Sequence, residues 1–326
     1  MKNILVTGGA GYIGSQIVHL LIKKKYNVFI IDDLSEGFKS LVNKKCKFYK
    51  INITNEKKVS EVIKKNKIDS VIHLAAKTKV SEAEKNPKKY FLNNITGTFT
   101  IVKVCIQNNV KNLIFSSTCA VYDEKVLKVK ETSLKNPKGI YGFTKLIGEE
   151  AVKKFFLKSF RNYAILRYFN VVGASPYDNL GQIQKGGDKL FKNFSVRLTK
   201  KKPVINIYGN NYNTYDGTCV RDYIHVFDIA EIHIKTLLKI NSSKVPLTLN
   251  CGYGKGISVL QVAKAFKKFT SKNVKINFKK RRTGDMEEIV ANNTKLKKIL
   301  RWKPRYFNLN EIVKTCMLWE KKMRNN

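Results

Sequence analysis

The chain has 326 residues, 43% of them hydrophobic and 11% aromatic, which is enough to bury a sizeable core and excludes a disordered chain. No apolar run approaches the roughly 20 residues that span a bilayer, and the N-terminal run 4–6 stops at Gly8, so we predict neither a membrane span nor a signal peptide. The formal net charge of +39 raises the possibility of nucleic-acid binding, but only nine of the 63 basic residues are arginine and the lysines are spread along the chain. We therefore interpret the charge as compositional drift and expect no nucleic-acid partner.

The six cysteines are scattered and form no CxxC pair. This pattern is typical of reduced thiols in a cytoplasmic protein without a cysteine metal site.

Short β-branched runs alternate with amphipathic stretches from the N-terminus onward. Strands are predicted at 2–7, 28–32, 47–53, 70–74, 112–116 and 163–168, and helices at 15–25, 56–65, 90–108 and 145–158. This alternation predicts an α/β fold, a doubly wound Rossmann-type parallel sheet. After Val172 a loop rich in Gly, Asn and Asp (174–188) leads into a smaller mixed α/β region. We predict one domain at 1–172 and a second at 173–326, with some later segments returning to the first.

A glycine-rich turn follows the first predicted strand. Its spacing, Gly8-xx-Gly11-xx-Gly14, permits a tight turn, close approach of the backbone to a pyrophosphate, and close packing of the next helix on the strand. Asp32 lies 18 residues beyond Gly14, at the end of the second predicted strand. Its carboxylate is placed to accept the ribose hydroxyls of NAD and would repel the extra phosphate of NADP. The turn therefore predicts NAD binding.

A second group of residues predicts acid–base chemistry. Tyr141 and Lys145 are one helical turn apart, so they share a helix face. A free phenol has a pKa near ~10, and a neighbouring ammonium favours the phenolate. Thr118 lies 23 residues before Tyr141, where the predicted strand 112–116 runs out. We predict that Thr118 shares a hydrogen bond with the substrate hydroxyl that Tyr141 deprotonates, although a helix cap or a strand-end turn would also explain a threonine there.

These motifs are similar to those of the extended short-chain dehydrogenase/reductase family. They read TGGAGYIG at the start, HLAA at 73–76, SST at 116–118 and YGFTK at 141–145. Within that family, RYFNVVGA at 167–174, DGTCVRDYIHV at 216–226 and RRTGD at 281–285 resemble the UDP-glucose (UDP-galactose) 4-epimerases. The resemblance covers essentially the whole chain and implies an isomerase of nucleotide-sugar and galactose metabolism. Domain 1–172 would bind NAD, domain 173–326 would bind the UDP-sugar, and the protein would form a homodimer.

The reaction implied by the resemblance is a redox-neutral inversion at C4 of a UDP-hexose through a 4-keto intermediate. Tyr141 would be the base, assisted by Thr118 and Lys145. The implied NAD-binding residues are Gly8, Gly11, Tyr12, Ile13, Gly14, Asp32, Asp33, Asn52, Ile53, Leu74, Ala75, Ala76, Asn93, Ser116, Tyr141, Lys145 and Tyr168. The implied substrate-binding residues are Thr118, Asn170, Leu190, Tyr208, Arg221, Arg282 and Asp285. His225, which lies in an apolar run, is expected to be a packed structural histidine.

Several positions depart from the family pattern. Asn52 stands where an Asp is usual, and its side-chain oxygen still offers an acceptor to the adenine amino group. Thr78 stands where some members carry a Lys near the cofactor phosphates, so that contact is lost or passed to Lys77 or Lys79. Asp33 and Asp123 replace a common Asn and Gly. Ile289 falls where the room for an N-acetyl group is decided, which leaves the choice between hexoses and N-acetylhexosamines open.

Rival functions remain at this level. A 4,6-dehydratase is disfavoured because Cys119 and Ala120, not an acidic pair, follow Thr118. A 4-epimerase for uronic acids would want a further polar or cationic anchor that the sequence does not place. A non-catalytic NAD- or RNA-binding protein on the same fold would not need Tyr141, Lys145 and Thr118 together.

Overall fold

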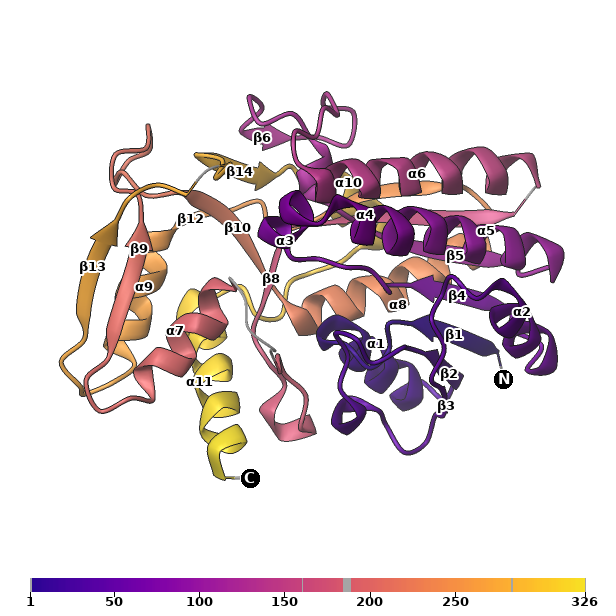
Figure 1. The fold of residues 1–326 in the computed structure, drawn as a ribbon, viewed down its shortest axis with the longest axis horizontal. Coiled ribbons are helices and arrows are strands. Elements are labelled where there is room, and N and C mark those ends of the chain that lie inside the picture. The colour runs from indigo at the N-terminus through magenta and orange to yellow at the C-terminus, as the bar shows by residue number, and fades with distance from the viewer. Residues whose placement is uncertain (1, 160, 184–188, 283, 326) are drawn as a thin grey trace.

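Seven parallel strands form the central sheet of the protein (Figure 1). The structure is a computed structural model, and it describes residues 2–159, 161–183, 189–282 and 284–325. The strand order is β11-β7-β5-β4-β1-β2-β3, and each neighbouring pair is parallel. The strand bounds are β1 (Asn3–Thr7), β2 (Asn27–Ile31), β3 (Lys47–Tyr49), β4 (Ser70–His73), β5 (Asn112–Thr118), β7 (Asn162–Tyr168) and β11 (Leu247–Cys251). The predicted Rossmann-type parallel sheet is therefore confirmed.

Helices cover both faces of this sheet. Successive residues of a strand point to opposite faces, and in β1 the side chains of Ile4 and Val6 pack into one core while that of Leu5 packs into the other. The first core also contains side chains of α1 (Tyr12–Lys23) and α8 (Val226–Ser243). The second contains side chains of α2 (Glu56–Lys65), α5 (Gly97–Gln107) and α6 (Ile140–Lys158). The β-branched runs at the centre of the sheet, β4 and β5, become fully buried strands for this reason.

A smaller mixed region lies beyond the carboxyl ends of the central strands (Figure 1). Its five-stranded sheet has the order β12-β10-β14-β6, with β8 also pairing with β10, and a separate two-stranded sheet pairs β9 with β13. These strands are β6 (Lys128–Val129), β8 (Asn170–Val172), β9 (Val204–Tyr208), β10 (Val220–His225), β12 (Gly256–Ser258), β13 (Lys275–Lys279) and β14 (Glu288–Ala291). The helices of this part of the chain are α7 (Leu190–Leu198), α9 (Val259–Lys268), α10 (Thr294–Leu300) and α11 (Leu309–Asn325).

The chain passes between the two regions more than once. After β8 and β10, helix α8 and strand β11 return to the central sheet, where β11 pairs with β7. In the opposite direction, β6 leaves the first region and pairs with β14. The division at 172/173 therefore separates most of the two regions but is crossed by these segments.

Several element boundaries differ from the sequence predictions. Helix α6 begins at Ile140 rather than at Lys145, because the Ile140 N–H donates to Glu84 Oε1 (2.8 Å), a cap supplied by another helix, α3 (Val80–Lys85). The predicted helix 90–108 is interrupted, with α4 (Pro87–Tyr90) and the π-helix η2 (Phe91–Thr96) preceding α5. Strand β5 extends to Thr118, whereas β3 ends at Tyr49. Short 3₁₀ turns occur at η1 (Lys39–Leu41), η3 (Cys119–Val121) and η4 (Pro176–Asp178).

Two further observations concern the described ranges. Part of the predicted loop 174–188 is described, with η4 and an isolated bridge between Ser175 and Leu180, whereas residues 184–188 lie outside the described residues. Among the described residues, no helix combines the length and apolarity needed to cross a membrane.

Candidate active site

The glycine-rich turn joins β1 to α1 and packs against the end of β4. Gly8 has φ +74°, and an added Cβ would lie 2.7 Å from the backbone nitrogen of Ala75. A Cβ on Gly14 would lie 2.1 Å from the Gly8 carbonyl oxygen, so helix and turn approach too closely for any side chain. Helix α1 has no side-chain cap and no acidic residue in its first turn. Its N-terminal N–H groups are thus available to an anion such as a pyrophosphate, and the turn fits a dinucleotide.

Asp32 follows β2 directly and is buried, with 7% of its surface exposed. Its two carboxylate oxygens accept the backbone N–H groups of Ala10 (3.0 Å) and Leu34 (2.9 Å). Burial raises the pKa of Asp32, and these two hydrogen bonds oppose the rise. The carboxylate is thereby fixed next to the glycine-rich turn, with lone pairs left for ribose hydroxyls.

The neighbouring polar side chains hold one another. Asp33 accepts hydrogen bonds from Ser35 and from Asn52 Nδ2 (2.9 Å), and these bonds lower its pKa although burial alone would raise it. The Asn52 Oδ1 atom, expected to remain an acceptor for adenine, already accepts the N–H (3.0 Å) and the hydroxyl (2.8 Å) of Thr54. In this arrangement Asn52 orders the loop around the acids rather than offering a free acceptor.

Thr118, Tyr141 and Lys145 come together at the carboxyl end of β5. The Thr118 hydroxyl lies close enough to the Tyr141 phenol to lower its pKa, and Thr118 Oγ1 also accepts the N–H of Ala120 (3.2 Å). Thr118 therefore serves as a turn cap and as the partner of Tyr141 at once. The close approach needs Gly142, since a Cβ there would lie 2.2 Å from the Ala120 carbonyl oxygen.

Burial dominates the electrostatics of this group. It raises the pKa of the Tyr141 phenol, against the effect of the Thr118 hydroxyl. It lowers the pKa of Lys145 to about 7, against the negative charge of Glu149. The Lys145 ammonium lies 4.7 Å from the centre of the Phe115 ring, and Lys145 is only 4% exposed. The ammonium therefore titrates near neutral pH, where a small change in its surroundings alters its charge.

The predicted substrate residues come from strands and loops of the smaller region. Arg221 of β10 donates to the carbonyl oxygens of Val220 (2.9 Å) and Glu287 (3.3 Å), and no carboxylate pairs with it in the described residues. Arg282 places its guanidinium 3.9 Å from the centre of the Tyr208 ring. In the described part of the chain, neither guanidinium is paired with a carboxylate.

The other predicted substrate residues lie at element ends or on the surface. Asn170 begins β8 and is exposed, Leu190 begins α7, and Asp285 is exposed between β13 and β14. Ile289 pairs in register with Arg221 and is buried, 1% exposed, in a cluster that includes Phe169 and Tyr122.

His225 is a packed structural histidine, as predicted. It is fully buried, stacks on Tyr306 with ring centres 4.0 Å apart, and accepts the N–H of Phe227 at the start of α8. Burial lowers its pKa to about 3, so the ring is neutral.

The sequence pattern of the NAD dependent epimerase/dehydratase family matches residues 4–252. The chain is a member of this family. A UDP-glucose 4-epimerase of Lactobacillus helveticus is 37% identical over 322 residues, which cover 98% of this chain and 97% of that protein. UDP-arabinose 4-epimerase 1 of Arabidopsis thaliana is 36% identical over 339 residues, which cover 100% of this chain and 81% of that protein. The crystal structure of UDP-glucose 4-epimerase from Bifidobacterium longum in complex with NAD+ and UDP superposes with a TM-score of 0.93 at 32% identity, covering 99% of each chain.

This member of the epimerase/dehydratase family has a lysine on each side of Thr78 in the loop after β4. Thr78, at the position where some members have a Lys, is exposed. Lys77 is instead buried, 8% exposed, and its ammonium donates to Ser35 Oγ (2.6 Å) close to Asp32 and Asp33. Lys79 forms an ion pair with Glu36 (3.4 Å). Two lysines thus tie the loop after β4 to the loop after β2.

Sequence reasoning missed several residues that organise the site. Asn94, next to the predicted cofactor residue Asn93, clamps the backbone of Lys77, accepting its N–H (2.8 Å) and donating to its carbonyl oxygen (3.0 Å). His73 is buried between the hydroxyls of Thr7 (2.7 Å) and Thr98 (3.1 Å). The sequence shows that Asn94 and His73 are polar, but it does not show the direction of either side chain.

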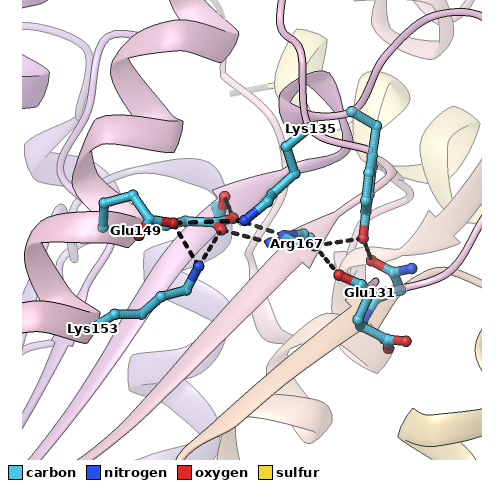
Figure 2. A network of polar contacts seen from close by, with 9 residues as sticks. Glu131, Lys135, Glu149, Lys153 and Arg167 are labelled. Atoms are coloured by element: carbon cyan, nitrogen blue, oxygen red, sulfur yellow. Dashed lines mark hydrogen bonds and ion pairs between the residues drawn. The ribbon is translucent and has the colours of Figure 1, made fainter. Parts of the chain in front are cut away.

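A buried polar network around Glu149 of α6 and Arg167 of β7 was not predicted from the sequence (Figure 2). Glu149 and Arg167 form a bidentate ion pair, Nε to Oε1 at 2.8 Å and Nη2 to Oε2 at 2.7 Å. Arg167 Nη1 also donates to the Tyr122 hydroxyl (2.8 Å) and to the Glu131 carbonyl oxygen (2.9 Å). The available signal in the sequence was Glu149, a glutamate on the apolar side of α6, one turn after Lys145.

We expect Lys77→Met to weaken NAD binding about tenfold, because the substitution removes the charged hydrogen bond between the two loops and leaves Asp32 and Asp33 without their nearest cation. The measurement is NAD content after purification together with the rate at which NAD dissociates. Lys103→Met, which removes an exposed ion pair with Glu56 on the far side of α5, is the control. Equal NAD retention by both variants would exclude Lys77 from the cofactor site.

Proposed function

We propose that this protein is an NAD-dependent epimerase that inverts C4 of a UDP-hexose, interconverting UDP-glucose and UDP-galactose through a 4-keto intermediate. The observation that carries the proposal is the meeting of Thr118 at the end of β5 with Tyr141 and the buried Lys145 of α6, at the strand ends that also hold the glycine-rich turn. Membership of the family and full-length relatives named UDP-glucose 4-epimerase support it.

The cofactor would lie across the carboxyl ends of β1, β2, β4 and β5. The turn at 8–14 would hold the pyrophosphate at the start of α1, and Asp32 would accept the ribose hydroxyls. Tyr12 would lie at the edge of this site, where its hydroxyl donates to the Gly173 carbonyl oxygen (2.6 Å). Tyr168, whose hydroxyl is hydrogen-bonded to His233 (2.7 Å), would form part of the opposite wall.

Tyr141 is proposed as the base and acid of the reaction. Burial alone holds its phenol in the protonated form, so its use as a base needs positive charge beside it, which Lys145 supplies. Bound NAD+ would supply the hydride acceptor for C4 and a further positive charge next to the phenol. Thr118 would donate to or accept from the same substrate oxygen, and Tyr141 would return the proton once the sugar presents its other face.

This chemistry requires firm binding of the UDP and loose binding of the sugar, because the hexose must turn over between the two hydride transfers. Arg221 and Arg282 are proposed to grip the diphosphate, since neither guanidinium is engaged by a carboxylate in the described residues. Asp285 is proposed to hold the uridine ribose, and Asn170, Leu190 and Tyr208 to line the nucleotide site.

A related substrate is the alternative. N-acetylhexosamine and uronic acid forms of the UDP-sugar remain candidates, and the Arabidopsis relative is named for UDP-arabinose. Ile289 is buried against Phe169, and its side chain, which is of intermediate size, is proposed to line the sugar position.

We further propose that the protein is a homodimer through the α5/α6 face. Five large apolar side chains are exposed along this face and the π-helix before it, namely Phe91, Leu92, Phe99, Phe143 and Phe155, with exposures from 38% to 58%. They form two edge-to-face pairs, Phe91 with Phe143 and Phe99 with Phe155, with ring centres 6.3 and 6.0 Å apart. A row of paired aromatics on two neighbouring helices is typical of a surface that a second copy covers.

The purified protein is expected to convert UDP-galactose into its 4-epimer without added cofactor, and Tyr141→Phe to retain NAD while losing turnover by roughly 100-fold or more. Anion-exchange chromatography of the UDP-sugars gives both results, and parallel incubation with UDP-N-acetylgalactosamine and UDP-glucuronic acid ranks the alternatives. Undiminished turnover in Tyr141→Phe would remove the phenol from the reaction.

Arg221→Ala should weaken UDP binding roughly 10- to 100-fold with a smaller effect on NAD content, because it removes charge-assisted hydrogen bonds to the diphosphate. Calorimetric titration with UDP measures the change. Arg301→Ala, an exposed arginine at the end of α10, is the control. An unchanged UDP affinity in Arg221→Ala would contradict the assignment.

Phe99→Glu is expected to raise the dissociation constant of the dimer about 100-fold or more, because it places a charge in an apolar contact. Sedimentation velocity over a range of concentrations reports the change. Phe278→Glu alters an equally exposed phenylalanine on β13, 46% exposed, and should leave the dimer intact. A monomeric wild-type protein would refute the proposed dimer.

A further inference from the structure

The Glu149–Arg167 ion pair is buried more completely than the residues proposed for catalysis. Glu149 is 0% exposed and Arg167 1%. Besides the two bonds from Arg167, Glu149 Oε1 accepts the Ser117 hydroxyl at 2.6 Å. Figure 2 shows Lys153 reaching the same carboxylate from the helix surface, with Nζ 3.6 Å from Oε2. A buried ion pair contributes little net stability compared with an apolar replacement. Its location, rather than stability, therefore indicates its role.

That location is directly behind the reacting groups. Ser117 and Arg167 are register partners on β5 and β7, and the next pair of partners is Thr118 with Tyr168. Because successive strand residues point to opposite faces, the pair that binds Glu149 fixes the strand ends from behind while the following pair faces the proposed site. On α6, Glu149 lies one turn beyond Lys145 and two turns beyond Tyr141. The Glu149 carboxylate thus links α6 and β5, which carry the proposed catalytic residues, to the neighbouring strand β7.

Three titratable groups that interact with Tyr141 or Lys145 are neutral, and the charged Arg167 and Lys153 are both paired with Glu149. Burial lowers the pKa of His73, on β4, to about 3, and the charge of Lys145 lowers it in the same direction. Burial raises the pKa of Cys119, which follows β5, to about 12, and it raises the pKa of Tyr168, on β7, well above its ordinary value. Among the described residues shown to interact electrostatically with Lys145, Glu149 is therefore the one anion.

We propose that Glu149, held in place by Arg167 and Ser117, is a positioning residue that keeps the Lys145 ammonium charged next to Tyr141. The proposal rests on the proposed function of Tyr141 and Lys145. Arg167 fixes the carboxylate by a two-bond fork, and Tyr122 extends the support to β11 by donating to Asn250 Oδ1 (2.6 Å). The rest of the network, through the backbone at Glu131, joins the loop that carries β6 to the same framework.

The test is a titration of the Tyr141 phenol in the NAD-bound protein. The ultraviolet absorbance of the ionised phenol, measured as the difference between a protein with Tyr141 and its Tyr141→Phe counterpart, gives the apparent pKa without any substrate. In Glu149→Gln, Lys145 loses the anion that opposes the effect of burial, so it is deprotonated at lower pH and favours the phenolate less. We expect the apparent pKa of Tyr141 to rise by about 1 unit, and the acid limb of the turnover profile to move to higher pH by the same amount.

Three further variants separate positioning from mere structural support. Glu150→Gln makes the same charge change on the next residue of α6, which is half-exposed, and should leave the titration unchanged. Arg167→Lys keeps both charges but loses the fork, so it should lower turnover without moving the titration. Glu149→Gln combined with Arg167→Met leaves no unpaired guanidinium and should reproduce the rise.

An unchanged titration in both Glu149 variants would overturn the proposal, and so would failure of both to fold and retain NAD, which would assign the pair a structural role. Because the absorbance needs no UDP-sugar, a protein that proves inactive on every sugar tested would refute the proposed function while still giving this answer.

Discussion

Parallel pairing of the seven central strands is the constraint on which the site depends. Parallel strands share one direction, so β1, β2, β4, β5 and β7 all end at the same edge of the sheet, and the residues that follow them are brought together whatever their separation in the chain. The glycine-rich turn, Asp32, the lysines after β4, Thr118 and Tyr168 each follow or end one of these strands. The smaller region then covers this edge with β8 and β10, which carry Asn170 and Arg221.

Burying charge at this edge creates the second constraint. Lys145, Glu149 and Arg167 are enclosed together, and none can be charged there without a partner. The Arg167 guanidinium donates four hydrogen bonds to fixed acceptors, two of them to Glu149, so the Glu149 carboxylate is satisfied and held in place. Burial lowers the pKa of Lys145 to about 7, and no such set of acceptors is shown for its ammonium among the described residues, so its charge responds to whatever is bound beside it. Hydrogen bonds thus fix Glu149 and Arg167, which support the site, whereas the charge of Lys145, beside the Tyr141 phenol, can change.

The same contrast appears in the loops around the proposed cofactor position. Short polar residues such as Asp33, Ser35, Asn52 and Thr54 satisfy one another locally, as such side chains commonly do in turns. Lys77 and Lys79 then connect this loop to the one after β4 by single long side chains. Lys77, one residue before Thr78, thus places its buried ammonium beside Asp32 and Asp33.

The sequence alone determined the central strands, the glycine-rich turn and the Tyr–Lys pair, because each depends on residues that are close together in the chain. β-branched runs between amphipathic segments specify buried parallel strands, a glycine spacing specifies a turn that no side chain can enter, and a Tyr and a Lys four residues apart must share a helix face. What the sequence could not decide depends on contacts between distant segments. The start of α6 at Ile140 depends on Glu84 of another helix, the direction of Asn94 and His73 depends on their packing, and the assignment of Glu149 depends on its meeting Arg167 and Ser117. The return of α8 and β11 to the central sheet is of the same kind, because which strand pairs with the open edge of a sheet is settled by the packing of the whole chain and not by the residues of that strand.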